Sequence, residues 1–438
     1  MSCWQSVPLA SLVRQGRGIS YGIVQPGEPQ ADGVPVLRVT DIRNGRIATH
    51  SPLRVLAHIE AAHSRTRLVG GELLLTLVGT VGEAAIVPPE LAGWNVARAV
   101  AVIPVVDDVG SYWTKLALEA PAVRELIYGR LNTTVQATLN LKDVAQLPIL
   151  MPSKDERAAI ATVIGALDDK IELNRRMSQT LEAIAQAIFK SWFVNFDPVC
   201  AKLNGEGAPI IQARLGLDDA TQALFPGQFS KQGPDGWQPA TLKQLTTKIG
   251  SGATPRGGRE VYVDEGMALI RSQNVYDSQF VWDGLAHITD DAARQLANVE
   301  VQAGDVLLNI TGASILRTCV VPPDVLPARV NQHVAIIRAK PCVPPHFLHL
   351  HLLQADTKAY LLGLNAGASR EAVTKAHIES VPLLYPGAEL LAAFGTKVAP
   401  LFAQAQVCAA EARALTGLRD ALLPKLLSGE LSTAAIVA

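Results

Sequence analysis

Apolar and polar residues follow two different patterns along the chain. In the first pattern, short runs rich in Val, Ile and Leu are bounded by Gly and Pro, which is typical of β-strands. Two longer stretches, residues 112–128 and 345–362, have the composition of helices. The pattern therefore predicts globular units of mixed α and β structure. The predicted strands fall within residues 33–42, 71–78, 97–103, 304–310 and 331–337.

The second pattern is a heptad repeat, in which apolar residues recur at alternating spacings of four and three. It begins after Pro152, where Ser153 as an N-cap and Glu156 three residues later predict the start of a helix. A second repeat follows Pro386. Each run of about 35–40 residues would form a helix about 50–60 Å long. The predicted seam positions are Ile160, Ile164, Leu167, Ile171, Asn174, Leu181, Ile188 and Trp192 in the first run, and Phe394, Val398, Leu401, Leu415 and Leu422 in the second.

These seams have two possible roles. Each could be a packing surface between two domains, or the two helices could pair with each other. A helix this long with a narrow apolar stripe cannot bury itself against one small domain, so we expect an antiparallel coiled coil. Such pairing would place two globular units at opposite ends, related by an approximate twofold axis. Asn174, a polar residue in the seam, would then specify the register at some cost in stability.

The chain contains an internal duplication. Trp4-Gln5 recurs 233 positions later as Trp237-Gln238, and residues 71–76 recur with the same polarity pattern at 304–309. One inserted residue then raises the offset to 234, at which Pro88-Pro89 coincides with Pro322-Pro323. Because the chain has only six Trp residues, the tryptophan match is hard to attribute to chance.

The duplication and the heptad repeats together predict an α+β fold with two similar mixed α/β domains and two long helices. We predict domain boundaries as follows: a first globular domain at 1–152, a long helix at 153–196, a connector rich in Gly and Pro at 197–236, a second globular domain at 237–385 and a second long helix at 386–432.

The composition fits a folded protein without strong overall charge. Of 438 residues, 48% are hydrophobic and 18% are charged, and the net charge of −1 excludes the basic signature of a generic nucleic-acid coat. The five cysteines are scattered, which favours a reducing compartment over a disulfide framework or a zinc knuckle. The N-terminus lacks the features of a signal peptide, and no apolar run approaches the roughly 18–20 residues that cross a bilayer. We expect a cytoplasmic protein.

Two similar units held apart by a stiff spacer suit a partner with approximate twofold symmetry. Duplex DNA has such symmetry, and half-sites about 34–36 Å apart are within reach of helices of this length. Because the two units differ in sequence, they would read two different half-sites. The same arrangement could instead space two modules that bind protein ligands, so a duplicated coiled-coil scaffold is the alternative interpretation.

Several segments resemble the conserved regions of type I restriction-modification specificity subunits. The resemblance covers essentially the whole chain and coincides with the duplication. The matching segments are residues 139–141 (Leu-Asn-Leu), 147–152, Glu156-Arg157, Ile160-Ala161, 167–171, Asn174, 189–193 (Phe-Lys-Ser-Trp-Phe), 196–199 (Phe-Asp-Pro-Val), Ala201-Lys202, Gly236-Trp237, 331–335 (Asn-Gln-His-Val-Ala) and 418–431.

This resemblance implies a division of labour between subunits. In that family, two target recognition domains each read one half of a split DNA site, and an antiparallel coiled coil docks two methyltransferase subunits, which a restriction subunit can join. The chain itself would be noncatalytic and would bind no cofactor. S-adenosylmethionine, ATP and Mg would be bound by the partner subunits.

Candidate DNA contacts come from segments that end apolar strands or form polar loops, because base edges are read by Arg, Asn, Gln, Ser and Thr and phosphates by Arg and Lys. Each segment also has a structural interpretation, as a surface turn or as the site of a structural arginine. Four sets of segments qualify: 38–44 with 271–277, 76–80 with 309–314, the Gly-rich loop 250–259, and 132–136 with 365–370. The candidates are Arg38, Thr40, Asp41, Arg43, Thr76, Thr80, Thr133, Thr134, Gln136, Thr254, Arg256, Arg259, Arg271, Gln273, Asn274, Asn309, Thr311, Ser314 and Arg370.

The sequence lacks the motifs of an enzyme active site. It contains neither an Asn-Pro-Pro-aromatic motif for a flipped adenine nor a GxxxxGK loop for ATP. His346, His349 and His351 have no nearby Cys or acid at ligand spacing, so we interpret them as surface histidines of a helix. We expect no catalytic residue and no metal site. Near neutrality also predicts weak DNA binding by the isolated chain, with tighter binding once partner chains add basic surface.

Overall fold

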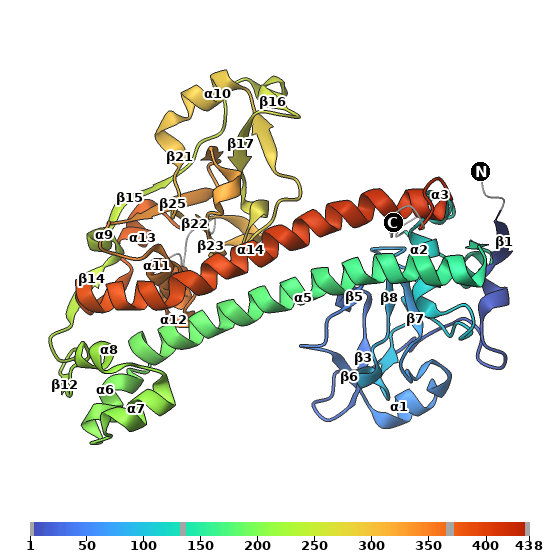
Figure 1. Ribbon diagram of the computed structural model, residues 1–438, viewed down its shortest axis with the longest axis horizontal. Helices are drawn as coiled ribbons and strands as arrows, with labels where there is room; N and C mark the ends of the chain where they lie inside the picture. The colour runs from blue at the N-terminus through green and yellow to red at the C-terminus, as the bar shows by residue number, and fades with distance from the viewer. Residues whose placement is uncertain (1–3, 132–136, 365–371, 434–438) are drawn as a thin grey trace. The chain divides into compact units, whose positions relative to one another are not determined.

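The computed structural model describes residues 4–131, 137–364 and 372–433. The candidates Thr133, Thr134, Gln136 and Arg370 lie outside these residues. The chain forms two compact units (Figure 1). The first unit comprises Met1–Leu173 and Ala412–Ala438, and the second comprises Asn174–Glu411.

The first unit is built on a four-stranded sheet in the order β2-β10-β7-β8 and a three-stranded sheet in the order β6-β3-β9. Two further pairs, β1 with β11 and β4 with β5, complete it. The strands are β1 (Gln5–Pro8), β2 (Ser20–Tyr21), β3 (Val34–Leu37), β4 (Ile42–Arg43), β5 (Arg46–Ile47), β6 (Leu53–Val55), β7 (Leu73–Thr76), β8 (Ala84–Ile86), β9 (Asn95–Val96), β10 (Val100–Ile103) and β11 (Pro148–Met151). The short helices are α1 (Ala57–Ala61), α2 (Ser111–Glu119), α3 (Pro121–Gly129) and α4 (Leu141–Ala145).

The second unit repeats this plan, with five strands instead of three in its second sheet. Its main sheets have the orders β15-β25-β22-β23 and β16-β20-β17-β24-β21, and β14 pairs with β26 and β18 with β19. The strands are β14 (Gln238–Thr241), β15 (Thr246–Ser251), β16 (Tyr262–Val263), β17 (Met267–Ile270), β18 (Val275–Tyr276), β19 (Gln279–Phe280), β20 (Ala286–Ile288), β21 (Glu300–Val301), β22 (Val306–Asn309), β23 (Thr318–Val320), β24 (Ala328–Val330), β25 (Val334–Ala339) and β26 (Pro382–Tyr385). The short helices are α9 (Leu242–Leu245), α10 (Asp290–Gln295), α11 (Pro345–Leu352), α12 (Ala355–Gly363) and α13 (Lys375–Glu379).

The duplication extends to the register of the strands. Val36 lies opposite Asn95 in the parallel pair β3-β9, and Leu269 lies opposite Arg329 in β17-β24. These pairs are related by shifts of 233 and 234 residues, the same offsets that relate the two halves of the sequence. The antiparallel pairs β7-β10 and β22-β25 agree in the same way, because Thr76 faces Val100 and Asn309 faces Val334. The two units are therefore two copies of one scaffold.

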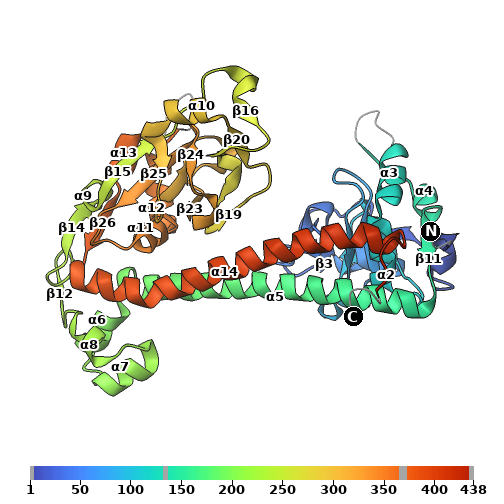
Figure 2. The ribbon, with the colours of Figure 1, turned by 45° about the horizontal axis from the view of Figure 1, so that its top comes forward.

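One helix covers the core side of the main sheet in each copy. In the first unit, α2 packs on β7 and β8, and in the second, α11 packs on β22, β23 and β25 (Figure 2). Trp113 and Phe347 occupy equivalent positions on these helices, and both are buried. The two predicted helical stretches are each broken into two helices, since Pro121 starts α3 and a short turn separates α11 from α12.

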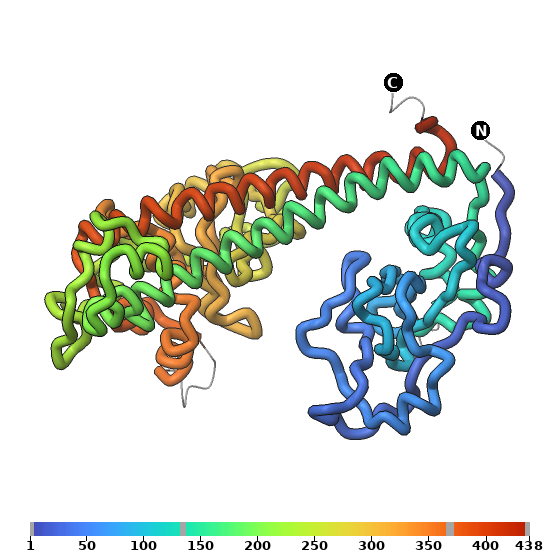
Figure 3. The backbone as a smooth tube through the Cα atoms, turned by 60° about the horizontal axis from the view of Figure 1, so that its bottom comes forward, coloured from blue at the N-terminus to red at the C-terminus, as the bar shows by residue number. Residues whose placement is uncertain are grey.

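The heptad runs form two helices of equal length, α5 (Lys154–Phe193) and α14 (Ala388–Leu427), each of 40 residues. Within the second unit, Asn174 Nδ2 donates to Glu411 Oε2 over 2.8 Å and Ser178 Oγ donates to the Ala405 carbonyl over 2.7 Å. The numbering rises along α5 as it falls along α14, so these segments lie side by side and antiparallel (Figure 3).

In the first unit the beginning of α5 and the end of α14 share a core. Ile160 and Ile164 belong to the same buried cluster as Leu423 and Leu426, and Arg419 pairs with Asp168 over 3.0 Å. The seam positions Ile171, Trp192, Phe394 and Val398 are also buried. The remaining predicted positions are half-buried: Leu167, Leu181, Ile188, Leu401, Leu415 and Leu422.

The segment 197–236, which we expected to be a connector, folds onto the second unit. It forms α6 (Asp197–Leu203), α7 (Ala208–Leu215), α8 (Asp219–Ala223) and the hairpin of β12 (Phe229–Ser230) and β13 (Gly233–Pro234). Val199, Ile211 and Phe225 join the cluster that contains Trp192 and Phe394. This segment therefore closes the core around the end of α5.

Candidate nucleic-acid interface

The second unit has an open polar depression at the loop ends of its main sheets. Three segments form it: the turn and strand that follow β17, the turn between β22 and β23, and the turn between β24 and β25. Arg317 is the one formally charged side chain among its described lining residues. The lining residues are Ser272, Gln273, Tyr276, Thr311, Gly312, Ala313, Ser314, Arg317 and His333.

Asn309, at the end of β22, forms the support beneath this depression. Its side chain is fully buried, and its Nδ2 donates to the carbonyls of Ser272 and Val275 over 2.9 and 3.1 Å and to Ser314 Oγ over 3.2 Å. A single amide thus joins two of the three lining segments. We predicted a DNA contact at Asn309, but in this structure the side chain shapes the surface from below.

Asn274 has a similar structural role in the turn Ser272–Asn274. Its Oδ1 accepts from the Arg271 backbone N over 3.0 Å, and its Nδ2 donates to the carbonyls of Val281 and Asp283. Arg271 Nη2 donates to the Gly284 carbonyl, and Gln273 Nε2 donates to the same oxygen. Of these three predicted contacts, Gln273 lines the depression, and the other two hold the turn.

Two pairs of side chains organise the wall of the depression. The Arg317 guanidinium lies over the Tyr276 ring, 4.2 Å from its centre. Thr311 Oγ1 and His333 Nδ1 lie 2.7 Å apart, and His333 Nε2 lies 2.9 Å from Gln332 Nε2. Thr311 and Ser314 were among the predicted contacts, whereas Tyr276, Arg317 and His333 were not. One signal could have found Arg317, because the offset of 234 aligns it with Glu83, a residue of opposite charge.

The β18-β19 hairpin beside the depression is tied to α11 and α12. Ser278 Oγ lies 3.1 Å from His349 Nε2, and Lys358 Nζ pairs with Asp277 over 2.7 Å. His349 is fully buried, and this burial lowers its pKa from 6.5 to about 3. The expectation of surface histidines was therefore wrong for His349, because α11 turns this face toward the sheet. Across the residues that the structure describes, no group of His, Cys, Asp and Glu could hold a metal ion.

The Gly-rich loop of the second unit lies apart from the depression. Thr254, Arg256 and Arg259 are exposed, and none of them lines the depression. A Cβ on Gly252 would lie 2.0 Å from the Val330 carbonyl oxygen, so glycine is required there by the chain's own backbone. The loop therefore packs closely against the end of β24 at Gly252.

The first unit presents the equivalent segments with different side chains. Arg38 is bound to Asp41 through two hydrogen bonds of 3.0 and 3.1 Å, and this pairing raises the pKa of Arg38. Asp41 also accepts from the Arg38 backbone N, just as Asn274 accepts from Arg271. Asp41 is buried, whereas Arg38, Thr40 and Arg43 are exposed.

At the end of β7, Thr76 is fully buried and holds the following turn. Its Oγ1 donates to the Thr80 carbonyl and accepts from the Glu83 backbone N over 2.9 Å. Thr80 is exposed. Thr76 therefore supports the turn from below, whereas Thr80 presents its side chain to solvent.

Described residues that follow the fourth predicted set pair with residues of the strand-end turns that contain the third set. Thr138, just after the segment that contains Thr133, Thr134 and Gln136, forms an isolated bridge with Val78. Ala372, two residues after Arg370, forms the equivalent bridge with Thr311. The described residues Thr138 and Ala372 thus reach the strand-end turns of the third set.

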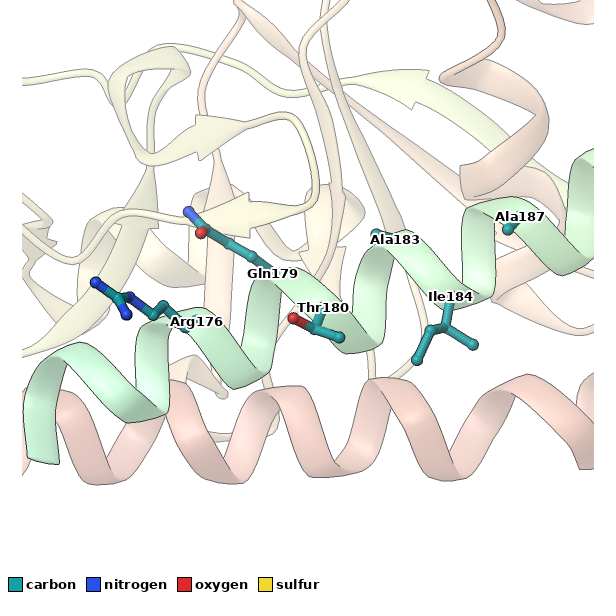
Figure 4. A pocket seen from close by; sticks show the side chains of 6 residues that line it. All are labelled: Arg176, Gln179, Thr180, Ala183, Ile184 and Ala187. Atoms are coloured by element: carbon teal, nitrogen blue, oxygen red, sulfur yellow. The ribbon is translucent and has the colours of Figure 1, made fainter. Parts of the chain in front are cut away.

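A second candidate surface lies along α5. A shallow depression on this helix is lined by exposed residues that include Ala183, Ile184 and Ala187 (Figure 4). Ile184 is 44% exposed and Met177, about two turns earlier, is 38% exposed. The surface is distinct from the buried seam of Asn174, Ala185 and Trp192. No helix in the described parts of the chain is long and apolar enough to cross a membrane.

Comparison with known proteins gives a consistent family. No family model matches the chain. The type I restriction enzyme HindI specificity subunit of Haemophilus influenzae is 28% identical over 339 residues, covering 69% of this chain and 72% of that protein. The MjaIX specificity subunit of Methanocaldococcus jannaschii is 24% identical over 370 residues, covering 82% and 78%.

Among solved structures, the S subunit of a type I restriction-modification system from M. genitalium matches 97% of this chain and 96% of its own, with a TM-score of 0.57 and 13% identity. At this identity the match shows a common fold. Together with the curated relatives, it confirms the resemblance that the sequence motifs indicated: the chain is a homologue of type I restriction enzyme specificity subunits.

Proposed function

We propose that the chain is the noncatalytic specificity subunit of a type I restriction-modification complex and that each unit reads one half of a bipartite DNA site. One observation carries this proposal. The two units share strand order and register, yet the same strand ends present different polar side chains. Reading two different half-sites requires the same scaffold in both units and different polar side chains on its surface.

The chemistry of the second unit's depression suits base recognition. Gln273, Thr311 and Ser314 provide amide and hydroxyl groups that both donate and accept, and Arg317 provides a planar donor fork. These are the groups that read base edges in the major groove. The exposed Arg256 and Arg259 are suited to phosphate, since they project from a loop without lining the depression.

The two long helices supply the remaining parts of the proposal. We propose that α5 and α14 form one antiparallel coiled coil that spaces the two units, and that its exposed apolar face docks two methyltransferase subunits. The apolar surface around Ile184 supports this, because an exposed apolar stripe on a helix marks a site of association. S-adenosylmethionine, ATP and Mg would then be bound by the methyltransferase and restriction subunits.

A domain exchange tests the reading function. The chain is co-expressed with the methyltransferase subunits of its host, and methylated bases are mapped across the genome. Replacing residues 237–385 with the equivalent unit of another specificity subunit should change one half of the methylated motif and leave the other half intact. An unchanged motif after the exchange would exclude DNA reading by this unit and favour the protein scaffold.

A point variant tests docking independently. Ile184→Glu should greatly reduce co-purification with the methyltransferase subunit, because it places a charge in the apolar surface of α5. Thr162→Glu, at an exposed position of the same helix, is the matched control and should co-purify normally. Equal recovery of the partner with both variants would place the docking surface elsewhere.

A further inference from the structure

Arg317 holds a fixed position within the depression of the second unit. Its backbone carbonyl accepts from Asn309 N over 2.9 Å, and its backbone N donates to the Ser314 carbonyl over 3.2 Å. Its guanidinium is restrained by the Tyr276 ring at 4.2 Å. Backbone and side chain are thus both positioned before any ligand binds.

The donor groups of Arg317 remain available for a ligand. In the described part of the chain, no carboxylate pairs with this guanidinium and no side chain or carbonyl accepts a hydrogen bond from it. A guanidinium that stacks on an aromatic ring uses its flat face for that contact. Its N–H groups point outward in the guanidinium plane and remain free to donate to a ligand. The neighbouring lining residues Gln273 and Ser314 are neutral, so no acid in the depression competes for it.

Resting on the proposed function, we infer that Arg317 is the specificity-determining residue that selects a guanine in the half-site read by the second unit. Guanine is the base that presents two adjacent acceptors, O6 and N7, to the major groove, and a rigid arginine fork matches both. A flexible exposed arginine would bind a phosphate equally well, whereas the Arg317 side chain is held against the Tyr276 ring within a depression.

The equivalent residue of the first unit fits the same scheme. Thr76 N donates to the Glu83 carbonyl over 3.0 Å, as Asn309 N donates to Arg317, so Glu83 and Arg317 occupy one place in the scaffold. A carboxylate cannot accept from guanine O6 or N7, because these atoms have no proton to donate. The two units therefore differ in base preference at this position.

The test uses the complex of the full chain with its methyltransferase subunits. Methylation rates are measured on duplexes in which each base pair of the motif is varied in turn. Arg317→Lys and Arg317→Gln should both reduce the preference for guanine at one position of the second unit's half-site by about 5- to 150-fold, the equivalent of one bidentate contact. The other half-site should be read as before. Arg294→Gln, which removes an exposed arginine of α10 in the same unit, is the control and should leave the motif unchanged.

The lysine variant separates base reading from phosphate binding. If Arg317 binds phosphate, Arg317→Lys keeps the charge and the full base preference, and Arg317→Gln weakens methylation equally on all sequences; that result overturns the inference. A wild-type complex that methylates without any sequence preference would instead overturn the proposed function itself. The two failures are therefore distinct.

A measurement on the wild-type complex avoids any dependence on folding of the variants. Each guanine of the half-site is replaced in turn by 7-deazaguanine, which lacks the N7 acceptor. One replacement should slow methylation markedly with wild-type protein and have no further effect with Arg317→Gln. If no guanine of that half-site responds in the wild-type complex, Arg317 does not read guanine.

Discussion

Thr76 in the first unit and Asn309 in the second end the same strand at the same register, and both are fully buried. Thr76 holds only its own turn, through contacts with residues 80 and 83. Asn309 also reaches 37 residues back in sequence to Ser272 and so binds two turns together. The comparison teaches that a buried polar residue at a strand end can set the shape of a surface depression from below, without being exposed in it.

The long helices are also held differently in the two units. In the second unit, Phe394 lies among the rings of Phe189, Trp192, Phe193 and Phe347, with centre-to-centre distances of 5.0–6.3 Å. In the first unit the equivalent of Phe394 is Ile160, which packs in the cluster of Leu423 and Leu426. The helices are therefore held by packed aromatic rings in the second unit and by aliphatic side chains in the first.

The largest expected effect comes from truncating these two equivalent residues. Phe394→Ala should lower the free energy of unfolding by about 3–5 kcal/mol, because it empties the centre of an aromatic cluster. Ile160→Ala should also destabilise, but by less. Denaturant titration followed by circular dichroism measures both losses. If Phe394→Ala loses no more stability than Ile160→Ala, the aromatic cluster stabilises the helices no better than the aliphatic cluster does.

A smaller effect is expected from removing the two strand-end residues. Asn309→Ala leaves the Ser272 and Val275 carbonyls without this donor and should cost about 2–4 kcal/mol, whereas Thr76→Ala should cost about 1–2 kcal/mol. Hydrogen exchange of the backbone amides gives the readout. Asn309→Ala should increase exchange in both the 271–277 and the 310–316 segments. Faster exchange confined to 310–316 would contradict the role of Asn309 in joining the two turns.

Lowering the pH should destabilise the second unit through His349, whose equivalent in the first unit is a different residue. His349 in the second unit corresponds to Lys115 in the first. The folded chain keeps His349 neutral, with a pKa of about 3, while the unfolded chain takes up a proton below about pH 6.5. Its contribution to stability is therefore complete above pH 6.5 and is lost as the pH falls toward 3.

The slope for one such group is about 1.4 kcal/mol per pH unit. Burial raises the pKa of Glu182 to about 7, which acts in the opposite direction between pH 7 and about 4.5. Comparison of wild type with His349→Gln cancels this contribution. The difference in unfolding free energy between the two proteins should shift by about 1.4 kcal/mol for each pH unit below 6.5. If the difference in unfolding free energy stays constant from pH 7 to pH 5, the folded chain takes up a proton at His349 as readily as the unfolded chain does, and the pKa of His349 is not lowered.

The smallest effect is expected in the middle of the helix pair. Asn174 is buried and bound to Glu411, and its equivalent on α14 is Cys408, which is also buried. Asn174→Leu should raise the free energy of unfolding by about 1 kcal/mol, since it replaces a buried polar group in the seam. Cys408→Ser, the matched change in the opposite sense, should lower it. A loss of stability in Asn174→Leu would mean that the hydrogen bond to Glu411 outweighs the gain in apolar packing.

Much of the scaffold could be predicted from the sequence because its signals are local or repeated. The predicted strands 71–78 and 304–310 contain β7 and β22, and the heptad runs contain α5 and α14. The connector at 197–236 was harder to predict, because its three short helices are stabilised by packing of Val199, Ile211 and Phe225 into the second unit's core. Nothing in local periodicity encodes that contact.

The candidate site was predictable by region, and less so by residue. The segments chosen after β17 and β22 do line the depression through Gln273, Thr311 and Ser314. Asn274 and Asn309 have the same polar character, but hydrogen bonds to backbone carbonyls hold them inside. Polarity alone does not show whether an amide faces solvent or satisfies a buried turn.

The duplication, the alternation of strands and turns and the extent of the two long helices were determined by the sequence itself, because periodicity and a constant offset of 233 to 234 residues express them directly. Only the tertiary structure decided which polar side chains form the surface. Tyr276 and Arg317 come from hairpins 41 residues apart, and their stacking depends on the pairing of whole strands that brings the two turns together.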